Sequence, residues 1–251
     1  MKQFSIIITG KELFCKVKDI NGYIISSFFS EKGYKCREVR IIDDNYSLIR
    51  STILELAARN NDFVVVTGGL GGSGMDFTRK VALNITGENN VILGKFFRDN
   101  IKQCYRKWKC KIPKGVANQL LVPKESIVFH NKEGSAPAFK VDINNTPFFF
   151  LTGVPQEVES FVNNSIGRYI VKNIRVPNNA KSKMTHVFDR EAELTISKKI
   201  EEFNWFTDKD VEVYIRVDNN SIIVEIDFFK PNTDYMKKWN ELKNFKGENF
   251  E

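Results

Sequence analysis

The chain has 251 residues, and its 38 lysines and arginines against 31 aspartates and glutamates give a net charge of +7 with histidine counted as neutral. Hydrophobic residues make up 42% and charged residues 27%, a globular composition that excludes an intrinsically disordered chain. No apolar run approaches the roughly 18 residues of a membrane span, and the N-terminus lacks a signal peptide's cleavage site. We therefore expect a cytoplasmic protein with no membrane partner.

Cysteines and histidines narrow the chemistry further. The four cysteines form no C-x-x-C pair, which excludes a zinc ribbon and a thioredoxin-type site and favours reduced thiols. Only two histidines are present, His130 and His186, so a site with three histidine ligands is impossible. If the protein is an enzyme, we expect carboxylates and backbone amides to carry its chemistry.

The excess of basic residues is densest between residues 102 and 114, where lysines and arginines interleave with Tyr105 and Trp108. A solvated helix face followed by a loop is the interpretation we favour. Attraction of anionic small molecules comes second and DNA binding third. We therefore expect no nucleic-acid partner.

The first part of the chain alternates strands and helices. Apolar runs predict strands at 4–9, 35–42 and 63–67. Helical spacing of apolar residues predicts helices at 21–32 and 47–59, and a third helix that begins near Asp76. This alternation is typical of a parallel sheet covered by helices on both faces. Because the carboxyl ends of such strands share one edge, three segments should converge there: Thr9–Gly10, Ile42–Asp43 and Thr67–Gly71.

The remaining elements complete an α/β fold. We predict a helix at 91–111, strands at 127–130, 138–143 and 147–151, and a long helix at 155–172. The polar stretch 177–183 predicts a linker, and beyond it we expect a helix at 191–203, a β-hairpin of 211–217 with 222–228, and a final amphipathic segment. The predicted domains are 1–174 and 175–251, the second a small structural or oligomerisation module.

The clearest candidate site is the segment from Thr67 to Thr78. Five of its twelve residues are glycines, which stand between a predicted strand and a predicted helix. Without side chains, successive backbone N–H groups can form a nest for a phosphate at the positive end of a helix. The alternative is that the glycines serve only the turn and that Asp76 only caps the helix. Five glycines exceed what a tight turn requires, so we favour phosphate binding; the loop matches neither a Walker A nor a G-x-G-x-x-G motif.

Acidic residues follow the same three strands. Asp43 and Asp44 end the second strand, Glu12 follows the first, and Asp76 follows the third. Oxygen donors of this kind are those that Mg²⁺ prefers, although capping of helices by Asp43, Asp44, Asp19 or Asn21 competes with this interpretation. Carboxylates that face a phosphate repel it unless a cation intervenes, so the pattern favours a metal-bridged phosphate ester site.

Several segments occur together in a recognisable order along residues 3–172: Gly10-Lys11-Glu12-Leu13, Lys18-Asp19-Ile20-Asn21, Asp43-Asp44, Thr67-Gly68-Gly69-Leu70-Gly71, Asp76-Phe77-Thr78-Arg79, Gln119 with Pro123, Asn131 with Gly134-Ser135-Ala136-Pro137, and Leu151-Thr152-Gly153-Val154-Pro155-Gln156-Glu157. They resemble the signatures of the MoaB/Mog-type molybdopterin-binding domain, in the form of the N-terminal domain of the competence/damage-inducible CinA proteins. We expect no CinA amidase domain, because the chain ends too soon for one.

The resemblance implies a three-layer α/β/α fold with a mostly parallel sheet, and metal-dependent hydrolysis of ADP-ribose or a related nucleoside diphosphate derivative to AMP and a sugar phosphate. The expected cofactor is a divalent metal (Mg, Mn or Co) on Asp43, Asp44 and Asp76, and the expected catalytic residues are Asp43, Asp76 and Glu12. The expected substrate-binding residues are Gly10, Asp19, Asn21, Thr67, Gly68, Gly69, Leu70, Gly71, Gly72, Ser73, Gly74, Thr78, Gly134, Ser135, Ala136, Pro137, Gly153 and Pro155.

Two alternatives share this site. One is a molybdopterin-binding protein or adenylyltransferase of molybdenum-cofactor biosynthesis, and the other is a non-catalytic nucleotide-binding protein. Met75 stands where the family usually has the first Asp of a pair, which weakens the metal assignment and adds weight to the non-catalytic alternative. In each case the expected ligand is a phosphorylated nucleotide or pterin, and the resemblance implies a homo-oligomer, a dimer or a trimer.

Overall fold

A computed structural model describes residues 2–87, 90–176, 182–189, 193–219 and 221–245. The chain forms two compact units, Met1–Val176 and Pro177–Glu251. Among the described residues, no helix has both the length and the apolar character needed to cross a bilayer. The four cysteines are all free thiols.

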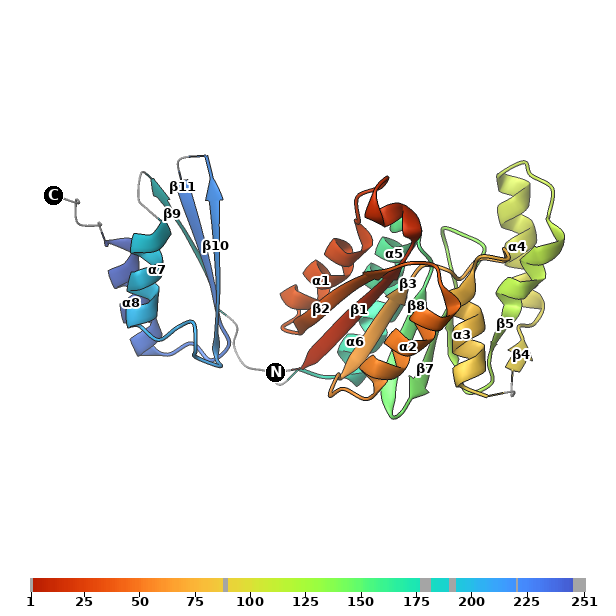
Figure 1. Ribbon diagram of the computed structural model, residues 1–251, viewed down its shortest axis with the longest axis horizontal. Coiled ribbons are helices and arrows are strands. Elements are labelled where there is room, and N and C mark those ends of the chain that lie inside the picture. Colours follow the sequence, from red (N-terminus) through yellow and green to blue (C-terminus); the bar gives the residue numbers. More distant parts are fainter. Residues whose placement is uncertain (1, 88–89, 177–181, 190–192, 220, 246–251) are drawn as a thin grey trace. The chain divides into compact units, whose positions relative to one another are not determined.

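The larger unit alternates strands with helices over its first half and ends in a hairpin and a long helical segment (Figure 1). Its elements are β1 (Gln3–Thr9), η1 (Lys11–Phe14), α1 (Asn21–Glu31), β2 (Lys35–Ile42), α2 (Tyr46–Ala57), β3 (Phe63–Thr67), α3 (Phe77–Ile85), β4 (Asn90–Ile92), α4 (Lys95–Lys107), η2 (Lys114–Leu120), β5 (Leu121–Pro123), β6 (Ile127–Phe129), β7 (Ala138–Ile143), β8 (Thr146–Leu151), α5 (Pro155–Ser160), the π-helical η3 (Phe161–Ser165) and α6 (Ile166–Asn173).

A six-stranded sheet in the order β2-β1-β3-β8-β7-β6 forms the middle layer of the described part of this unit. The pairs from β2 to β8 are parallel, and β8, β7 and β6 pair antiparallel. The hairpin between β7 and β8 turns at Asn144 and Asn145, whose φ angles of 49° and 63° are the positive values that a tight hairpin turn demands. The predicted fold class, a mostly parallel sheet in an α/β fold, is confirmed.

Helices cover both faces of this sheet because its strands are apolar on both sides. On one face α1, α5, η3 and α6 pack over side chains such as Phe4 and Phe63. On the other face α2 and α3 pack over side chains such as Val64 and Phe148. Neighbouring residues Val64 and Val65 therefore enter different cores. This three-layer arrangement leaves the carboxyl ends of β1, β2, β3 and β8 together at one edge of the sheet (Figure 1).

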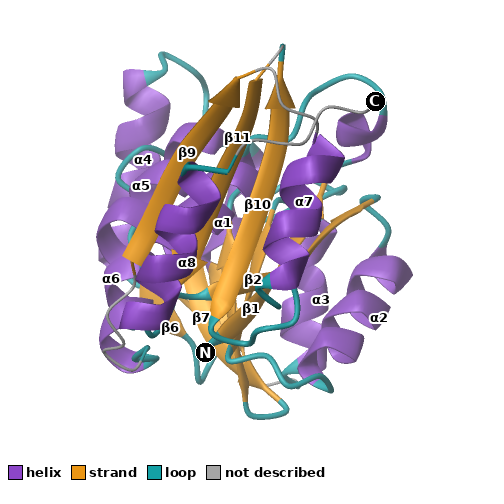
Figure 2. Ribbon diagram, turned by 90° about the vertical axis from the view of Figure 1, so that its left-hand side faces the viewer, coloured by secondary structure: helices purple, strands orange, loops and turns teal. Residues whose placement is uncertain are grey.

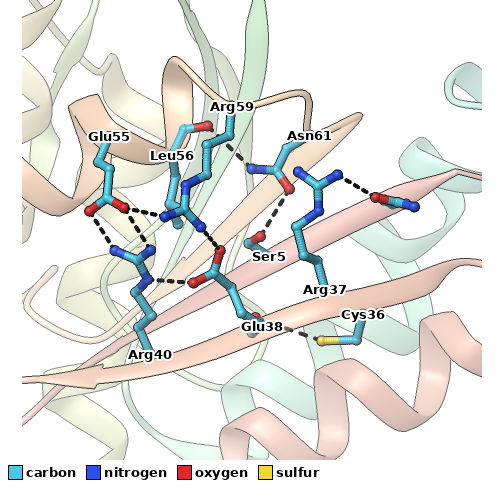
Figure 3. A network of polar contacts seen from close by, with 10 residues as sticks. Ser5, Cys36, Arg37, Glu38, Arg40, Glu55, Leu56, Arg59 and Asn61 are labelled. Atoms are coloured by element: carbon cyan, nitrogen blue, oxygen red, sulfur yellow. Dashed lines mark hydrogen bonds and ion pairs between the residues drawn. The ribbon is translucent and has the colours of Figure 1, made fainter.

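The edge strand β2 is tied to α2 by a network of charged side chains, which Figure 3 shows. Arg40 makes a two-pronged contact with Glu55 at 2.7 and 2.8 Å and reaches Glu38 at 2.6 Å. Arg59 contacts Glu38 at 2.6 Å and Glu55 at 2.5 Å. Charged side chains of this kind protect an edge strand from pairing with another chain.

The predicted helix at 91–111 is wrong at its start. Asn90–Ile92 forms the strand β4, which pairs antiparallel with β5, and the helix α4 begins only at Lys95. The apolar run Val91–Leu93 suits either structure by periodicity, and only its pairing with a segment thirty residues away makes it a strand.

The smaller unit is a three-stranded antiparallel sheet in its described residues, ordered β10-β11-β9, with two helices on one face (Figure 2). Its elements are β9 (Ser182–Asp189), α7 (Glu193–Glu202), β10 (Val211–Asp218), β11 (Ser221–Phe228) and α8 (Thr233–Lys243). The predicted hairpin of β10 and β11 is confirmed. Strand β9 is a correction: residues 182 and 183, expected in a linker, begin a strand that pairs with β11. The rest of that expected linker, 177–181, lies outside the described residues.

Candidate functional site

A pocket of about 480 Å³ lies at the edge of the main sheet where the strands end. Thr9 closes β1, Asp44 follows β2, the glycine loop follows β3, and Thr152 follows β8. The predicted convergence of strand ends is therefore found in the structure. The lining residues are Thr9, Glu12, Asp44, Gly68, Gly69, Leu70, Gly71, Met75, Asp76, Gln119, Ser135, Ala136, Thr152, Gly153, Val154 and Glu157.

Glycines at the pocket floor allow three backbones to meet. Gly68 has a φ of 102° and Gly69 a φ of 66°, a region that side chains strongly disfavour. A Cβ at Gly68 would collide with the carbonyl oxygen of Thr9, and a Cβ at Gly153 would lie 3.3 Å from the Cα of Gly68. The ends of β1, β3 and β8 are thus in backbone contact, which no larger residue at Gly68 would permit.

Asp76 serves the glycine loop as well as the pocket. Its Oδ2 accepts a hydrogen bond of 2.6 Å from the N–H of Ser73, and its carboxylate occupies the space that a Cβ at Gly71 would need. The loop therefore already binds one anionic oxygen, that of its own Asp76, at Ser73. The part of the loop from Gly68 to Gly71 remains open to the pocket.

Arg79 lies behind this loop and is only 2% exposed. It donates to the carbonyl oxygens of Leu70 at 3.0 Å, Leu121 at 2.8 Å and Pro137 at 3.4 Å. These carbonyls belong to the glycine loop, to the first residue of β5 and to the loop before β7, and Leu70, Gln119 and Ala136 from the same segments line the pocket. Burial lowers the pKa of Arg79 to about 10, against the opposing effect of Asp76, so the guanidinium remains charged at neutral pH. It places a buried positive charge beneath the glycine loop.

Four carboxylates line the pocket: Glu12, Asp44, Asp76 and Glu157. Partial burial raises the pKa of Asp44, and repulsion from Glu12, Asp43 and Asp76 raises it further, while a hydrogen bond from the N–H of Lys11 opposes these effects. An anionic ligand in this pocket therefore meets the buried charge of Arg79 behind the glycine loop and also four carboxylates, one of which, Asp76, lies against that loop.

The residues expected to hold a metal are only partly brought together. Asp44 and Asp76 line the pocket, and Asp43 does not. Within the described ranges, no group of three or more His, Cys, Asp or Glu side chains has the arrangement of a metal site. A metal on Asp44 and Asp76 would therefore need further oxygen ligands, such as those of a bound phosphate, and we assign no chemical step to a metal.

Three buried side-chain oxygens at the pocket have no hydrogen-bond partner among the described residues. They are Oε1 of Gln119, Oγ1 of Thr152 and Oδ1 of Asn21. Gln119 and Thr152 line the pocket, and Asn21 stands directly behind it, donating to Gly153 O at 2.9 Å and to Thr67 Oγ1 at 3.2 Å. Buried polar atoms are nearly always paired in folded proteins, so these three oxygens call for a partner that the described residues do not supply, such as a bound water or a ligand.

A loop held by Asn131 forms another wall of the pocket. Asn131 Oδ1 accepts from the N–H of Gly134 at 2.9 Å, and its Nδ2 donates to Ala136 O at 2.9 Å and to Glu157 Oε2 at 2.8 Å. Ser135 and Ala136 line the pocket within this loop. The same amide thus shapes the loop and orients the carboxylate of Glu157 in the first turn of α5.

The predicted site residues divide into three groups. Those that line the pocket are Glu12, Asp44, Gly68, Gly69, Leu70, Gly71, Asp76, Ser135, Ala136 and Gly153. Those in the second group support its walls without lining it: Asn21, Thr67 and Thr78. The others lie outside the lining: Gly10, Asp19, Asp43, Gly72, Ser73, Gly74, Gly134, Pro137 and Pro155.

Two of the helix-capping alternatives are decided by hydrogen bonds. Asp19 accepts from the N–H of Gly22 at 3.1 Å and so caps the start of α1. Helix α2 is capped by Asn45, whose Oδ1 accepts from Leu48 N at 3.0 Å. Asp44 is therefore not needed as a cap.

Sequence reasoning left six lining residues out of the site: Thr9, Met75, Gln119, Thr152, Val154 and Glu157. Gln119 and Glu157 stand inside the motifs that carry the family resemblance, which was the available signal for them. Thr152 and Val154 stand inside one of these motifs as well, but the sequence does not reveal that the hydroxyl of Thr152 is buried without a partner.

Comparison with known proteins assigns this chain to a family. Residues 5–171 match the family described as "Probable molybdopterin binding domain", which covers more than half of the chain. The chain belongs to the molybdopterin-binding domain family. Family membership extends over β1 to α6, the elements that build the pocket.

Individual relatives agree with this assignment. The chain is similar to a CinA-like protein of Syntrophotalea carbinolica, 28% identical over 162 residues, which are 61% of this chain and 37% of that protein. It is 29% identical over 188 residues to a CinA-like protein of Geotalea uraniireducens, covering 75% of this chain and 44% of that protein. The chain thus spans about two fifths of the length of these curated relatives.

A solved structure supports the fold of this molybdopterin-binding domain. The crystal structure of the protein CinA with unknown function from Thermoplasma acidophilum superposes with a TM-score of 0.57 at 23% sequence identity. The match covers 69% of this chain and 98% of that one.

Proposed function

We propose that the larger unit binds a phosphorylated pterin or nucleotide of the molybdopterin class in the pocket at the ends of β1, β3 and β8. One observation carries the proposal: a glycine floor backed by the buried charge of Arg79 shares one pocket with buried oxygens that lack partners on Gln119 and Thr152. The first feature suits an anionic group, and the second suits a polar ring.

The phosphate belongs on the glycine side. Gly68 to Gly71 bring backbone within reach of a ligand without side-chain obstruction, and Arg79 beneath them favours negative charge. A buried charge acts through a medium of low polarity, where attraction is stronger than in water. Ser73 already illustrates the affinity of this loop for an anionic oxygen through its contact with Asp76.

The ring belongs near Gln119 and Thr152. Oε1 of Gln119 only accepts hydrogen bonds, so it calls for an N–H donor, which pterin and adenine rings both provide. The hydroxyl of Thr152 can donate or accept. A pocket of about 480 Å³ lies within the range of roughly 300–1,000 Å³ that small-molecule sites usually have.

Between the two activities considered from the sequence, family membership supports the molybdopterin-related one. The matched domain is described by its binding of molybdopterin. Hydrolysis of ADP-ribose stays a prediction, and a divalent cation that offsets repulsion between Asp44, Asp76 and the phosphate is part of the proposal for any phosphorylated ligand.

Isothermal titration calorimetry of the full chain tests the proposal. The ligands are 6-hydroxymethylpterin phosphate and AMP, each beside its unphosphorylated counterpart, with and without Mg²⁺. We expect the phosphorylated member of at least one pair to bind about tenfold tighter or more, the effect of one charge-assisted hydrogen bond. Chromatography of a parallel sample with ADP-ribose reports whether the same pocket also hydrolyses it.

Gln119→Leu is the matching variant, and Gln156→Leu, at an exposed position outside the pocket, is its control. We expect weaker ligand binding in the first and unchanged binding in the second. Equal affinity for phosphorylated and unphosphorylated ligands, or full affinity in Gln119→Leu, would contradict the proposal.

A further inference from the structure

A groove separate from the main pocket runs beside α4 and the loop that follows β6. It consists of two hollows of about 280 and 200 Å³, and both are lined by His130 and Lys132. Side chains of α4, among them Lys107 and Trp108, line the first hollow. Side chains of α5, η3 and α6, among them Arg168, line the second.

The groove is positively charged. Lys107, Lys132 and Arg168 line it, and Glu133 is the carboxylate among its lining residues. None of the three cations forms an ion pair with another described residue. The three cations that line the groove repel one another, and a bound anion offsets this repulsion through its attraction to each of them.

His130 stands between the two hollows in a fixed orientation. Asn100 donates its Nδ2 to Gly134 O at 3.1 Å, so its Oδ1 is left to accept from His130 Nε2–H at 3.0 Å. The ring of Phe96 packs on the imidazole with centroids 4.9 Å apart. With Nε2 protonated and held, Nδ1 is the atom that gains a proton when an anion makes the charged form favourable.

We propose that this groove is a second ligand site, which binds a pyrophosphate-type anion, either free or as the phosphate tail of a nucleotide, on Lys132 and His130 with Lys107 and Arg168 on either side. Each hollow is smaller than the range of roughly 300–1,000 Å³ for whole organic ligands, so each suits one phosphoryl group. Lysine and arginine side chains are the usual partners of phosphate oxygens. The exposed face of Trp108 at one end offers a surface on which a nucleotide base can stack.

The groove and the main pocket share the wall between them. From His130 a chain of hydrogen bonds runs through Asn100 to Gly134 and Asn131, and from there to Glu157, which lines the main pocket. Because the loop 130–136 contributes to both cavities, an anion in the groove stiffens one wall of the main pocket.

Nuclear magnetic resonance of the histidine rings tests this proposal with an internal control. His130 and His186 are the only two histidines of the chain, and His186 belongs to β9 of the smaller unit. Sodium pyrophosphate is titrated at low ionic strength, and the pH titration of both rings is recorded with and without it. We expect a raised pKa for His130 and no change for His186. Titration with ADP tells whether the site takes a nucleotide or the free anion. Tighter binding of ADP than of pyrophosphate would identify a nucleotide as the ligand, and equal binding would identify the free anion.

Lys132→Gln and Arg168→Gln are the test variants, and Lys124→Gln, at an exposed position outside both hollows, is the control. We expect each test variant to weaken pyrophosphate binding about tenfold or more, the loss of one charge-assisted hydrogen bond, and the control to bind as the wild type does. An unresponsive His130, or full binding in both test variants, would overturn the proposal. Gln119→Leu separates it from the proposed function, because that variant alters the main pocket and leaves the response of His130 intact.

Discussion

The side-chain amide of Asn131 donates to Glu157 Oε2 at 2.8 Å and so joins the loop after β6 to the first turn of α5. Two features of the pocket depend on the Asn131 amide: its bonds to Gly134 and Ala136 position Ser135 and Ala136, and its bond to Glu157 directs that carboxylate. Asn131 itself is 2% exposed, and its hydrogen bonds to Ala136 and Gly134 are buried.

Asn131→Ala tests how much this amide contributes. The change leaves the N–H of Gly134 and the carbonyl of Ala136 without their partner, and we expect the free energy of unfolding to fall by about 2–3 kcal/mol. Urea denaturation measures it. Asn164→Ala, which removes a solvent-exposed amide bonded to Ser160 O, serves as control and should change stability by less than about 0.5 kcal/mol. Equal effects of the two substitutions would contradict this account.

Arg79→Met separates support for the loops from electrostatic attraction. Removing the guanidinium leaves the backbone carbonyls of Leu70, Leu121 and Pro137 without this donor, and we expect a loss of about 2–4 kcal/mol in unfolding free energy. We also expect the preference for a phosphorylated over an unphosphorylated ligand to shrink in calorimetric titrations.

Arg79→Lys is the companion variant, because it keeps a positive charge and loses the planar fork. It should lose stability while retaining most of the preference for phosphate. If Arg79→Met lowered both affinities by the same factor, the residue would be only a support for the loops.

Thr152→Val should raise stability and weaken binding. The hydroxyl of Thr152 is buried without a partner, and replacing it by a methyl group removes that cost, so we expect a gain of about 1 kcal/mol in the unligated protein. Ligand affinity should fall, because the hydroxyl is then missing when the ligand arrives. Thermal unfolding measures the stability of the unligated protein, and the shift of the unfolding temperature on adding ligand reports the ligand affinity. A loss of stability in the unligated protein would show that the hydroxyl has a partner of its own.

Asp44→Asn should stabilise the unligated protein in a pH-dependent way. The pKa of Asp44 is raised above its ordinary value of 3.8, first by burial and then by Glu12, Asp43 and Asp76. A raised carboxyl pKa means that the folded state binds the proton more tightly than the unfolded state does. The contribution of Asp44 to the stability of the wild type therefore falls as the pH rises from 3.8 through the raised pKa.

The gain in Asp44→Asn should be present at pH 7 and vanish below pH 3.8, where both states of the wild type are protonated. Urea midpoints at a series of pH values measure it. Asp142→Asn, at an exposed carboxylate paired with Lys140, should show no such gain. A gain that persisted unchanged at the lowest pH would mean that charge is not its source.

Periodicity and composition were enough to predict the architecture of the larger unit. Strands such as Phe63–Thr67 are apolar on both sides, which indicates a sheet between two helical layers, and the helices that separate them make it parallel. The order of strand ends then brings Glu12, Asp44 and Gly68 to one edge. The local sequence was sufficient for these predictions, because it contains both the pattern of faces that a strand buries and the kind of segment that connects one strand to the next.

Long-range contacts decided the rest. Lys183 and Asn90 belong to strands only because β11 and β5 supply their partners, and no local pattern contains that information. Asp43 and Asp44 are neighbours in sequence, yet only Asp44 reaches the pocket, because the backbone turns there, with the N–H of Asn45 donating to the carbonyl oxygen of Asp43. Arg79 reaches Leu121 and Pro137, which lie 42 and 58 residues further along the chain, only because the tertiary structure packs these segments together. The same packing buries the side-chain oxygens of Gln119 and Thr152 without a partner.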